Sequence, residues 1–190
     1  MIPRPIHLVR DLWVALGLYW LIAAFRRTRA QKREPIAKRL AHLLVMASAS
    51  VLLCYREPWW GILNQRFLPE AGWIAWAGVT LTAAGVAVAI WARRHLGKYW
   101  SAEVTIRSGH ELIRTGPYAR IRHPIYTGML LALAGTVLVI GEYRALAAMA
   151  IAVIGFVRKA KKEESFLKGQ FGAAFEEHRR LTGFFLPHFS

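Results

Sequence analysis

Long apolar runs separated by clusters of basic residues limit the folds open to this chain more than any other feature. The runs lie at residues 6–25, 36–55, 72–92, 125–140 and 145–157. The run at 72–92 contains no charged residue, and at ~1.5 Å per residue a helix of this length crosses a hydrocarbon layer of ~30 Å. Because 55% of the 190 residues are hydrophobic, one soluble core could not bury so much apolar surface. The sequence therefore predicts an all-α integral membrane protein with about five transmembrane helices.

The length and composition of the later runs predict how the helices pack. As helices, the runs at 125–140 and 145–157 reach only about 24 and 20 Å. We therefore expect a tight helical hairpin that returns to the side on which it starts. Small residues in the runs at 72–92 and 125–140 predict that these two helices approach each other closely. They include Gly78, Gly85, Gly128 and Gly135.

A formal net charge of +15 is compatible with two classes of protein, nucleic-acid binders and membrane proteins. The basic residues lie in clusters between the apolar runs, with seven Lys and Arg in each of 26–39, 93–122 and 158–180. This pattern is typical of cytoplasmic loops that meet anionic lipid headgroups. No nucleic-acid-binding motif is visible, so we expect membrane lipids and no nucleic acid as partners. The positive-inside rule predicts an outside N-terminus and a cytoplasmic C-terminus.

The polar chemistry of such a chain must come from two segments, 93–123 and 158–190, because the apolar runs contain almost no ionisable groups. Both segments are predicted to face the cytoplasm. The single cysteine, Cys54, has no second cysteine with which to form a disulfide or a metal site. We expect one domain over residues 1–190, without a metal, and the sequence makes no prediction of oligomeric state.

The first polar segment ends in a motif that places polar groups at the start of a membrane helix. Gly116-Pro117 marks a turn, and Pro124 suits the first turn of a helix. His123 therefore lies at the N-terminal end of that helix, where backbone N–H groups can bind a carboxylate. The alternative is an ordinary helix start at the membrane surface, with Arg120 and Arg122 contacting headgroups.

The second polar segment contains a pair of carboxylates, Glu163 and Glu164, just beyond the last apolar run. One of them could hold an ammonium group. The alternative is a solvated helix stabilised by i,i+4 pairs such as Lys159 with Glu163. Leu167, Phe171 and Phe175 repeat every four residues, which predicts an amphipathic helix lying on the headgroups.

Together these motifs resemble the isoprenylcysteine carboxyl methyltransferase family and the related phospholipid methyltransferases. The signature is an Arg-His-Pro-x-Tyr-x-Gly run, here Arg122 to Gly128, preceded by Gly116-Pro117-Tyr118. A Glu-Glu pair and a Phe-Gly follow, here Glu163-Glu164 and Phe171-Gly172. The resemblance covers roughly the last hundred residues, by order and spacing of these motifs.

The resemblance implies a helical membrane fold that binds S-adenosylmethionine at its cytoplasmic face, between the loop before the hairpin and the C-terminal tail. Residues 72–190 would carry this part. The implied cofactor residues are His110, Leu112, Gly116, Tyr118, His123, Tyr126, Glu163 and Glu164. The tail departs from the family pattern, which usually has Tyr at the positions of Phe175 and His178. Arg179 and Arg180 are the nearest candidates for aligning an acceptor carboxylate.

The expected activity is methyl transfer from S-adenosylmethionine to a lipid-like acceptor. A carboxylate is already ionised at neutral pH and needs only an Arg to align it. An amine must lose a proton, for which His123, His110 or a Glu would serve. Because basic residues outnumber acidic ones in both polar segments, we favour the carboxylate of a prenylcysteine-type substrate. The alternatives are a phospholipid or other lipid-amine methyltransferase, and a non-catalytic membrane subunit that binds anionic lipids.

Overall fold

The computed structural model describes residues 4–25, 36–97 and 112–188, and their regular secondary structure is helical. The α-helices are α1 (Pro5–Phe25), α2 (Ile36–Cys54), α3 (Gly72–Leu96), α4 (Pro124–Ile140), α5 (Tyr143–Phe171) and α6 (Ala173–Leu181). Two 3₁₀ helices, η1 (Pro58–Asn64) and η3 (Gly116–Ala119), lie in the connections. The all-helical prediction is confirmed. Among the described residues, two helices are long and apolar enough to cross a membrane, Pro5–Ala23 and Gly72–Leu96.

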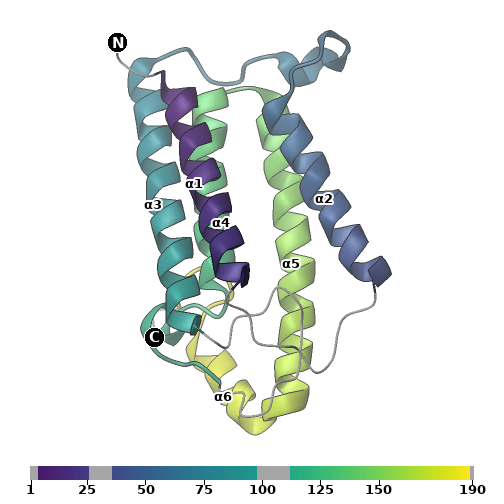
Figure 1. Cartoon of the computed structure of the whole chain (residues 1–190), viewed down its shortest axis with the longest axis vertical. Coiled ribbons are helices and arrows are strands. Elements are labelled where there is room, and N and C mark those ends of the chain that lie inside the picture. Colours follow the sequence, from purple (N-terminus) through teal and green to yellow (C-terminus); the bar gives the residue numbers. More distant parts are fainter. Residues whose placement is uncertain (1–3, 26–35, 98–111, 189–190) are drawn as a thin grey trace.

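The helices form two groups that run along the same axis (Figure 1). In one group α1, α3 and α4 lie side by side, and in the other α2 packs against α5. Trp13 on α1 donates from its indole Nε1 to Oγ1 of Thr136 on α4, at 2.9 Å. This bond satisfies two polar groups in an otherwise apolar contact, which includes the buried side chains of Leu16 and Val86.

Small residues let α3 and α4 approach closely, as predicted. A Cβ atom added to Gly78 would lie 2.6 Å from the carbonyl oxygen of Gly135. One added to Gly128 would lie 2.5 Å from the backbone nitrogen of Ala89. Real Cβ atoms do not come so near, so only glycine allows the two backbones to meet along this line. The contact fixes the start of α4 beside the end of α3.

Helix α5 is longer than predicted. The apolar run ends at Val157, but the helix continues to Phe171. The prediction used hydropathy, which ends where the helix enters its polar part, whereas Lys, Glu and Leu continue to favour helix. A further prediction was wrong in the same region: Leu167 and Phe171 do not share one helix with Phe175. Gly172, with φ 51°, ends α5 and begins α6, a conformation that favours glycine.

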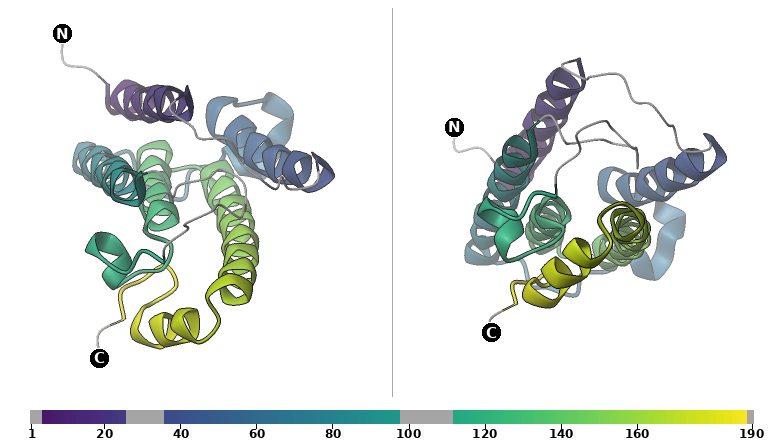
Figure 2. Two further views of the ribbon diagram at one scale, coloured as in Figure 1. Left: turned by 60° about the horizontal axis from the view of Figure 1, so that its bottom comes forward. Right: turned by 90° about the horizontal axis from the view of Figure 1, so that it is seen from below.

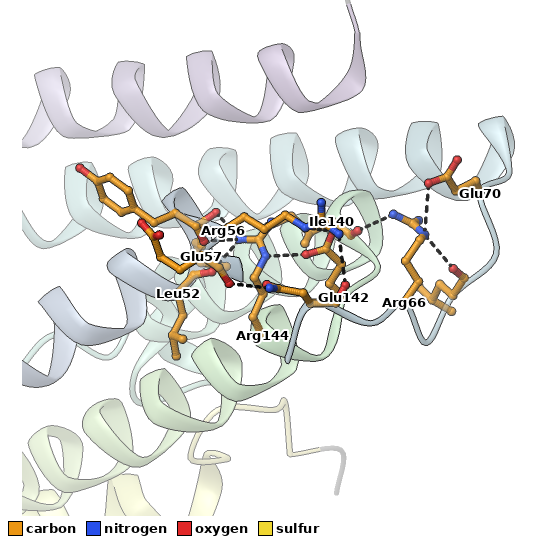
Figure 3. A network of polar contacts seen from close by, with 12 residues as sticks. Leu52, Arg56, Glu57, Arg66, Glu70, Ile140, Glu142 and Arg144 are labelled. Carbon is orange, nitrogen blue, oxygen red and sulfur yellow. Dashed lines mark hydrogen bonds and ion pairs between the residues drawn. The ribbon is translucent and has the colours of Figure 1, made fainter. Parts of the chain in front are cut away.

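A polar network joins the turn between α4 and α5 to the end of α2 (Figure 3). The buried guanidinium of Arg144 donates through Nη1 to the carbonyls of Leu52 and Leu53, at 2.7 and 2.9 Å, and through Nε to Glu142 at 2.6 Å. Arg66 donates to the carbonyl of Ile140 at 2.9 Å. These carbonyls lack partners within their own helices, so the arginines cap two helix ends and tie them together.

The other end of the bundle gathers the two polar segments. The end of α3, the start of α4, the end of α5 and all of α6 lie there (Figure 1), and the view from below shows α6 lying across that end (Figure 2). The two termini lie at opposite ends of the bundle (Figure 1).

Candidate functional site

His123 connects the two polar segments. It is the N-cap residue of α4, and its side chain is only 5% exposed. Its Nε2 lies 3.2 Å from Oε1 of Glu164, and its Nδ1 lies 3.6 Å from Oε2 of Glu163. Both carboxylates are on α5, so the extended helix brings the Glu pair to the Arg-His-Pro motif. Three of the residues expected at the site therefore contact one another.

Tyr126 completes this cluster from the first turn of α4. Its hydroxyl donates to Oε1 of Glu163 at 2.5 Å. Its ring stacks against His123, with centroids 5.7 Å apart, and against Phe156, with centroids 5.0 Å apart. The ammonium of Lys159 lies 5.8 Å from the centroid of the same ring. The Tyr126 ring thus already faces one cation.

Arg122 is a largely buried member of the cluster. Its Nε donates to Oε1 of Glu164 at 2.6 Å, and its Nη1 donates to the backbone carbonyls of Arg179, at 3.0 Å, and Thr182. Its side chain is only 11% exposed. Arg122 is therefore not the contact to lipid headgroups that the sequence analysis gave as an alternative. Its position beside His123 in the motif was the available signal.

Burial and neighbouring charges shift the pKa of His123 in opposite directions, and they do the same to the pKa of Glu164. Burial lowers the pKa of His123, but its contacts with Glu163 and Glu164 outweigh burial and raise that pKa above the ordinary value of 6.5. Burial raises the pKa of Glu164, but His123 and Arg122 outweigh it and hold that pKa below the ordinary 4.5. At neutral pH the cluster therefore favours an ionised Glu164 beside an imidazole that gains positive charge.

The C-terminal tail covers the start of α4. The backbone N–H of Arg122 donates to the carbonyl of Gly183 at 2.9 Å, and that of His123 donates to the carbonyl of Phe184 at 3.3 Å. The hydroxyl of Thr127 donates to the carbonyl of Phe185 at 2.7 Å. Residues 183–185 thus lie along the motif and shield His123 from solvent, an arrangement for which the sequence gave no signal.

A cavity of about 70 Å³ lies between the motif, α6 and the end of α3. It is lined by Leu96, Leu112, Ile113, Arg122, His123, Leu167, Phe175 and His178. The structure therefore places the expected residues Leu112 and His123 on its wall. His178 was noticed in the sequence only as a departure from the family pattern.

Gly116 and Tyr118 support this wall from η3. A Cβ on Gly116 would lie 2.6 Å from Cε1 of His95, and the residue has φ 58°, so glycine is required there. His95 bonds Thr115 Oγ1 at 2.9 Å and stacks on Tyr118. Burial and Glu163 raise the pKa of the Tyr118 hydroxyl, although Arg93 acts in the opposite direction. His110, another expected residue, lies outside the described residues.

The two arginines expected to align an acceptor lie on the exposed side of α6. Both Arg179 and Arg180 are exposed, and Arg179 pairs with Glu176 at 2.9 Å. The buried face of α6 carries Phe175 and His178 instead. Within the described part of the chain, no group of three or more His, Cys, Asp or Glu residues could hold a metal ion.

Comparison with known proteins finds a matching family. Residues 77–169, which include α4, Arg122, His123 and the Glu pair, match the isoprenylcysteine carboxyl methyltransferase (ICMT) family. The match covers just under half of the chain. It confirms the family resemblance noted in the sequence.

Curated relatives match parts of the chain. The chain is 33% identical over 70 residues to the uncharacterized protein YpbQ of Bacillus subtilis (strain 168). It is 29% identical over 123 residues to the cobalt-zinc-cadmium resistance protein CzcN of Cupriavidus metallidurans, and 28% over 119 residues to the nickel-cobalt-cadmium resistance protein NccN of Alcaligenes xylosoxydans xylosoxydans. These matches cover 37%, 64% and 62% of this chain. They span 39%, 54% and 54% of the relatives' own lengths.

A solved structure shares the fold. The eukaryotic intramembrane Ras methyltransferase ICMT superposes with a TM-score of 0.62 over 77% of this chain and 52% of its own, at 22% sequence identity. The chain therefore has an ICMT-like helical fold.

Proposed function

We propose that this chain transfers a methyl group from S-adenosylmethionine to a lipid-like acceptor, most directly the carboxylate of a prenylcysteine-type substrate. One observation carries the proposal: the buried His123 contacts both Glu163 and Glu164, so two motifs that are distant in the sequence form one cluster. The cluster lies within the segment that matches the ICMT family.

The chemistry of the cluster fits S-adenosylmethionine. Glu163 and Glu164 could accept hydrogen bonds from its ammonium group. The Tyr126 ring, which already faces Lys159, could face its sulfonium charge. His110, Leu112, Gly116, Tyr118 and His123 would complete the cofactor site, as the family resemblance implies. When bound, S-adenosylmethionine supplies a methyl group activated by the sulfonium.

The protein's own contribution to methyl transfer is positioning and exclusion of water. The transfer needs an acceptor held in line with the methyl group. Arg122 and His123 are held in place by the partly buried carboxylate of Glu164, and the tail at residues 183–185 shields them. With a carboxylate acceptor no proton must be removed. With an amine acceptor, His123 would be the nearest base within the cluster, and this keeps the lipid-amine alternative open.

We further propose a single multi-pass membrane domain over residues 1–190, with residues 72–190 carrying the cofactor site. The N-terminus would lie outside, and the C-terminus and the site would lie in the cytoplasm. The three clusters of seven basic residues support this orientation. The position of the termini at opposite ends of the bundle agrees with it (Figure 1).

The decisive experiment uses the purified full-length chain in detergent. Calorimetry should detect binding of S-adenosylhomocysteine, and labelled S-adenosylmethionine should methylate a prenylcysteine but not its preformed methyl ester. Methylation confined to amine lipids would replace the carboxylate assignment by the lipid-amine alternative. A folded chain that binds no S-adenosylhomocysteine would contradict the methyltransferase proposal and leave a subunit that binds anionic lipids.

A further inference from the structure

His178 lies on the inward face of α6. Because Gly172 redirects the chain after α5, α6 turns Phe175 and His178 inward. The two residues are 2% and 5% exposed, and both line the cavity beside Arg122 and His123. The wall of the candidate site therefore carries a polar ring from α6.

The imidazole of His178 makes no hydrogen bond within the described part of the chain. The other two polar groups of the cavity wall differ, since Arg122 and His123 are both bonded to Glu164. The side chain lines the cavity, and its ring nitrogens are not among the fully enclosed side-chain atoms that lack a partner. Polar groups in such a position nearly always have a hydrogen-bond partner. The natural partner for this ring is an atom of a molecule that enters the cavity.

The size and lining of the cavity limit what that molecule presents. About 70 Å³ is roughly the volume of two water molecules at ~30 Å³ each, which is enough for one small group of a larger ligand. Leu96, Leu112 and Ile113 form an apolar wall. In the described part of the chain, Nη2 of Arg122 also donates to no acceptor. The cavity thus offers two free donors in an apolar setting.

The charges around His178 favour an anion over a cation. Burial, Arg114 and Arg122 all lower the pKa of the imidazole, so at neutral pH the ring is uncharged and carries one N–H donor. Facing carboxylates are already paired, Glu177 with Arg114 at 3.1 Å and Glu164 with Arg122 at 2.6 Å. His123, on α4, adds no net negative charge.

We propose that His178 and Arg122 form a carboxylate subsite, in which the ring N–H and the free guanidinium nitrogen donate to the oxygens of one carboxylate. This inference rests on the proposed function, which supplies two carboxylates: that of the cofactor's amino-acid end and that of a prenylcysteine-type acceptor.

Three variants test the subsite. His178→Phe keeps a flat ring and removes both hydrogen-bonding nitrogens. His178→Gln keeps an N–H donor. His7→Gln, at an exposed position of α1, is the matched histidine control. Since the His178 ring has no hydrogen-bond partner within the described part of the chain, His178→Phe loses no such bond and should be at least as thermally stable as the wild type. A lower melting temperature for this variant would mean that the ring is already satisfied within the protein, and would overturn the proposal.

Measurements with different ligands distinguish the carboxylate of the cofactor from the carboxylate of the acceptor. If the cofactor's carboxylate is bound, His178→Phe should weaken S-adenosylhomocysteine by about tenfold and leave 5′-methylthioadenosine, which lacks that carboxylate, unchanged. If the acceptor's carboxylate is bound, the same variant should raise the KM for prenylcysteine by about tenfold with cofactor affinity unchanged. His178→Gln should restore most of either loss.

Two further results would overturn the subsite. If His178→Phe changes neither quantity while the wild type binds and turns over, the subsite is wrong and the proposed function stands. If the wild type itself binds no S-adenosylhomocysteine and no prenylcysteine, both the subsite and the proposed function are wrong.

Discussion

At the scale of single residues, the site depends on the contacts of Glu164. Its carboxylate accepts from Arg122 at 2.6 Å and lies 3.2 Å from His123. Removing one partner of a partly buried charge pair leaves the other charge uncompensated, which destabilises the fold by less than the ~3 kcal/mol typical of a fully buried pair. Glu164→Gln should therefore lower the melting temperature and weaken S-adenosylhomocysteine binding. Glu70→Gln, at an 80% exposed side chain at the other end of the bundle, is the control, and equal effects of the two would contradict this role.

The raised pKa of His123 gives the site a pH dependence with a definite sign. A histidine whose pKa is higher in the folded state stabilises the fold at acidic pH and loses that contribution as pH rises through its folded pKa. The stability advantage of the wild type over His123→Gln should thus shrink above the ordinary value of 6.5. Melting temperatures of both proteins in detergent, measured across this range, would check it. An advantage that grows with pH would have the wrong sign.

Arg179 and Arg180 remain a prediction about the acceptor. They lie on the exposed side of α6, where they could meet an acceptor carboxylate before it reaches the cluster. Arg179→Lys and Arg180→Lys keep the charge and lose the bidentate fork. Each should lower turnover with prenylcysteine while leaving S-adenosylhomocysteine affinity unchanged. A turnover that stays constant in both variants would assign alignment of the acceptor to buried groups such as Arg122.

At the scale of the elements, the α3–α4 contact is the part of the fold that tolerates change least. Gly78→Ala would place its new methyl 2.6 Å from the Gly135 carbonyl, whereas Gly17→Ala on α1 meets nothing. Overpacking costs about 1–3 kcal/mol, and alanine at an open helical site gains up to ~1 kcal/mol over glycine. The melting temperature should therefore fall for Gly78→Ala and stay constant or rise for Gly17→Ala. A stabilised Gly78→Ala would show that the helices are not in close contact.

The helices were largely predictable because apolar runs of sufficient length have few alternatives. The predicted starts of α2 and α3 agree with the structure. What hydropathy could not give was the polar continuation of α5 and the break at Gly172. The pairing of His123 with the Glu pair followed from the resemblance. The role of residues 183–185 did not, because it arises from backbone contacts that have no sequence signature. For Arg122 the only signal was its place in the motif beside His123.

At the scale of the whole molecule, the orientation in the membrane remains a prediction. The Lys and Arg distribution predicts that Ser190 is cytoplasmic and that Pro69 is outside. In Figure 1 the connection between α2 and α3 and the end of the chain lie at opposite ends of the bundle. Reporter fusions at the two positions should thus report opposite compartments. Fusions reporting the same compartment would contradict the five-helix topology.

The uninterrupted course of α5 has a consequence for the spacing of its residues. One end of the helix is tied to α2 by Arg144, and the other carries Glu163 and Glu164. Each residue turns a helix by about 100°, so one residue added between these points would rotate the carboxylates away from His123. Seven added residues would nearly restore their direction but would displace them by about 10 Å along the axis. The number of residues in α5 therefore sets both the distance and the direction of the two carboxylates. The site depends on this number as well as on the identity of the residues.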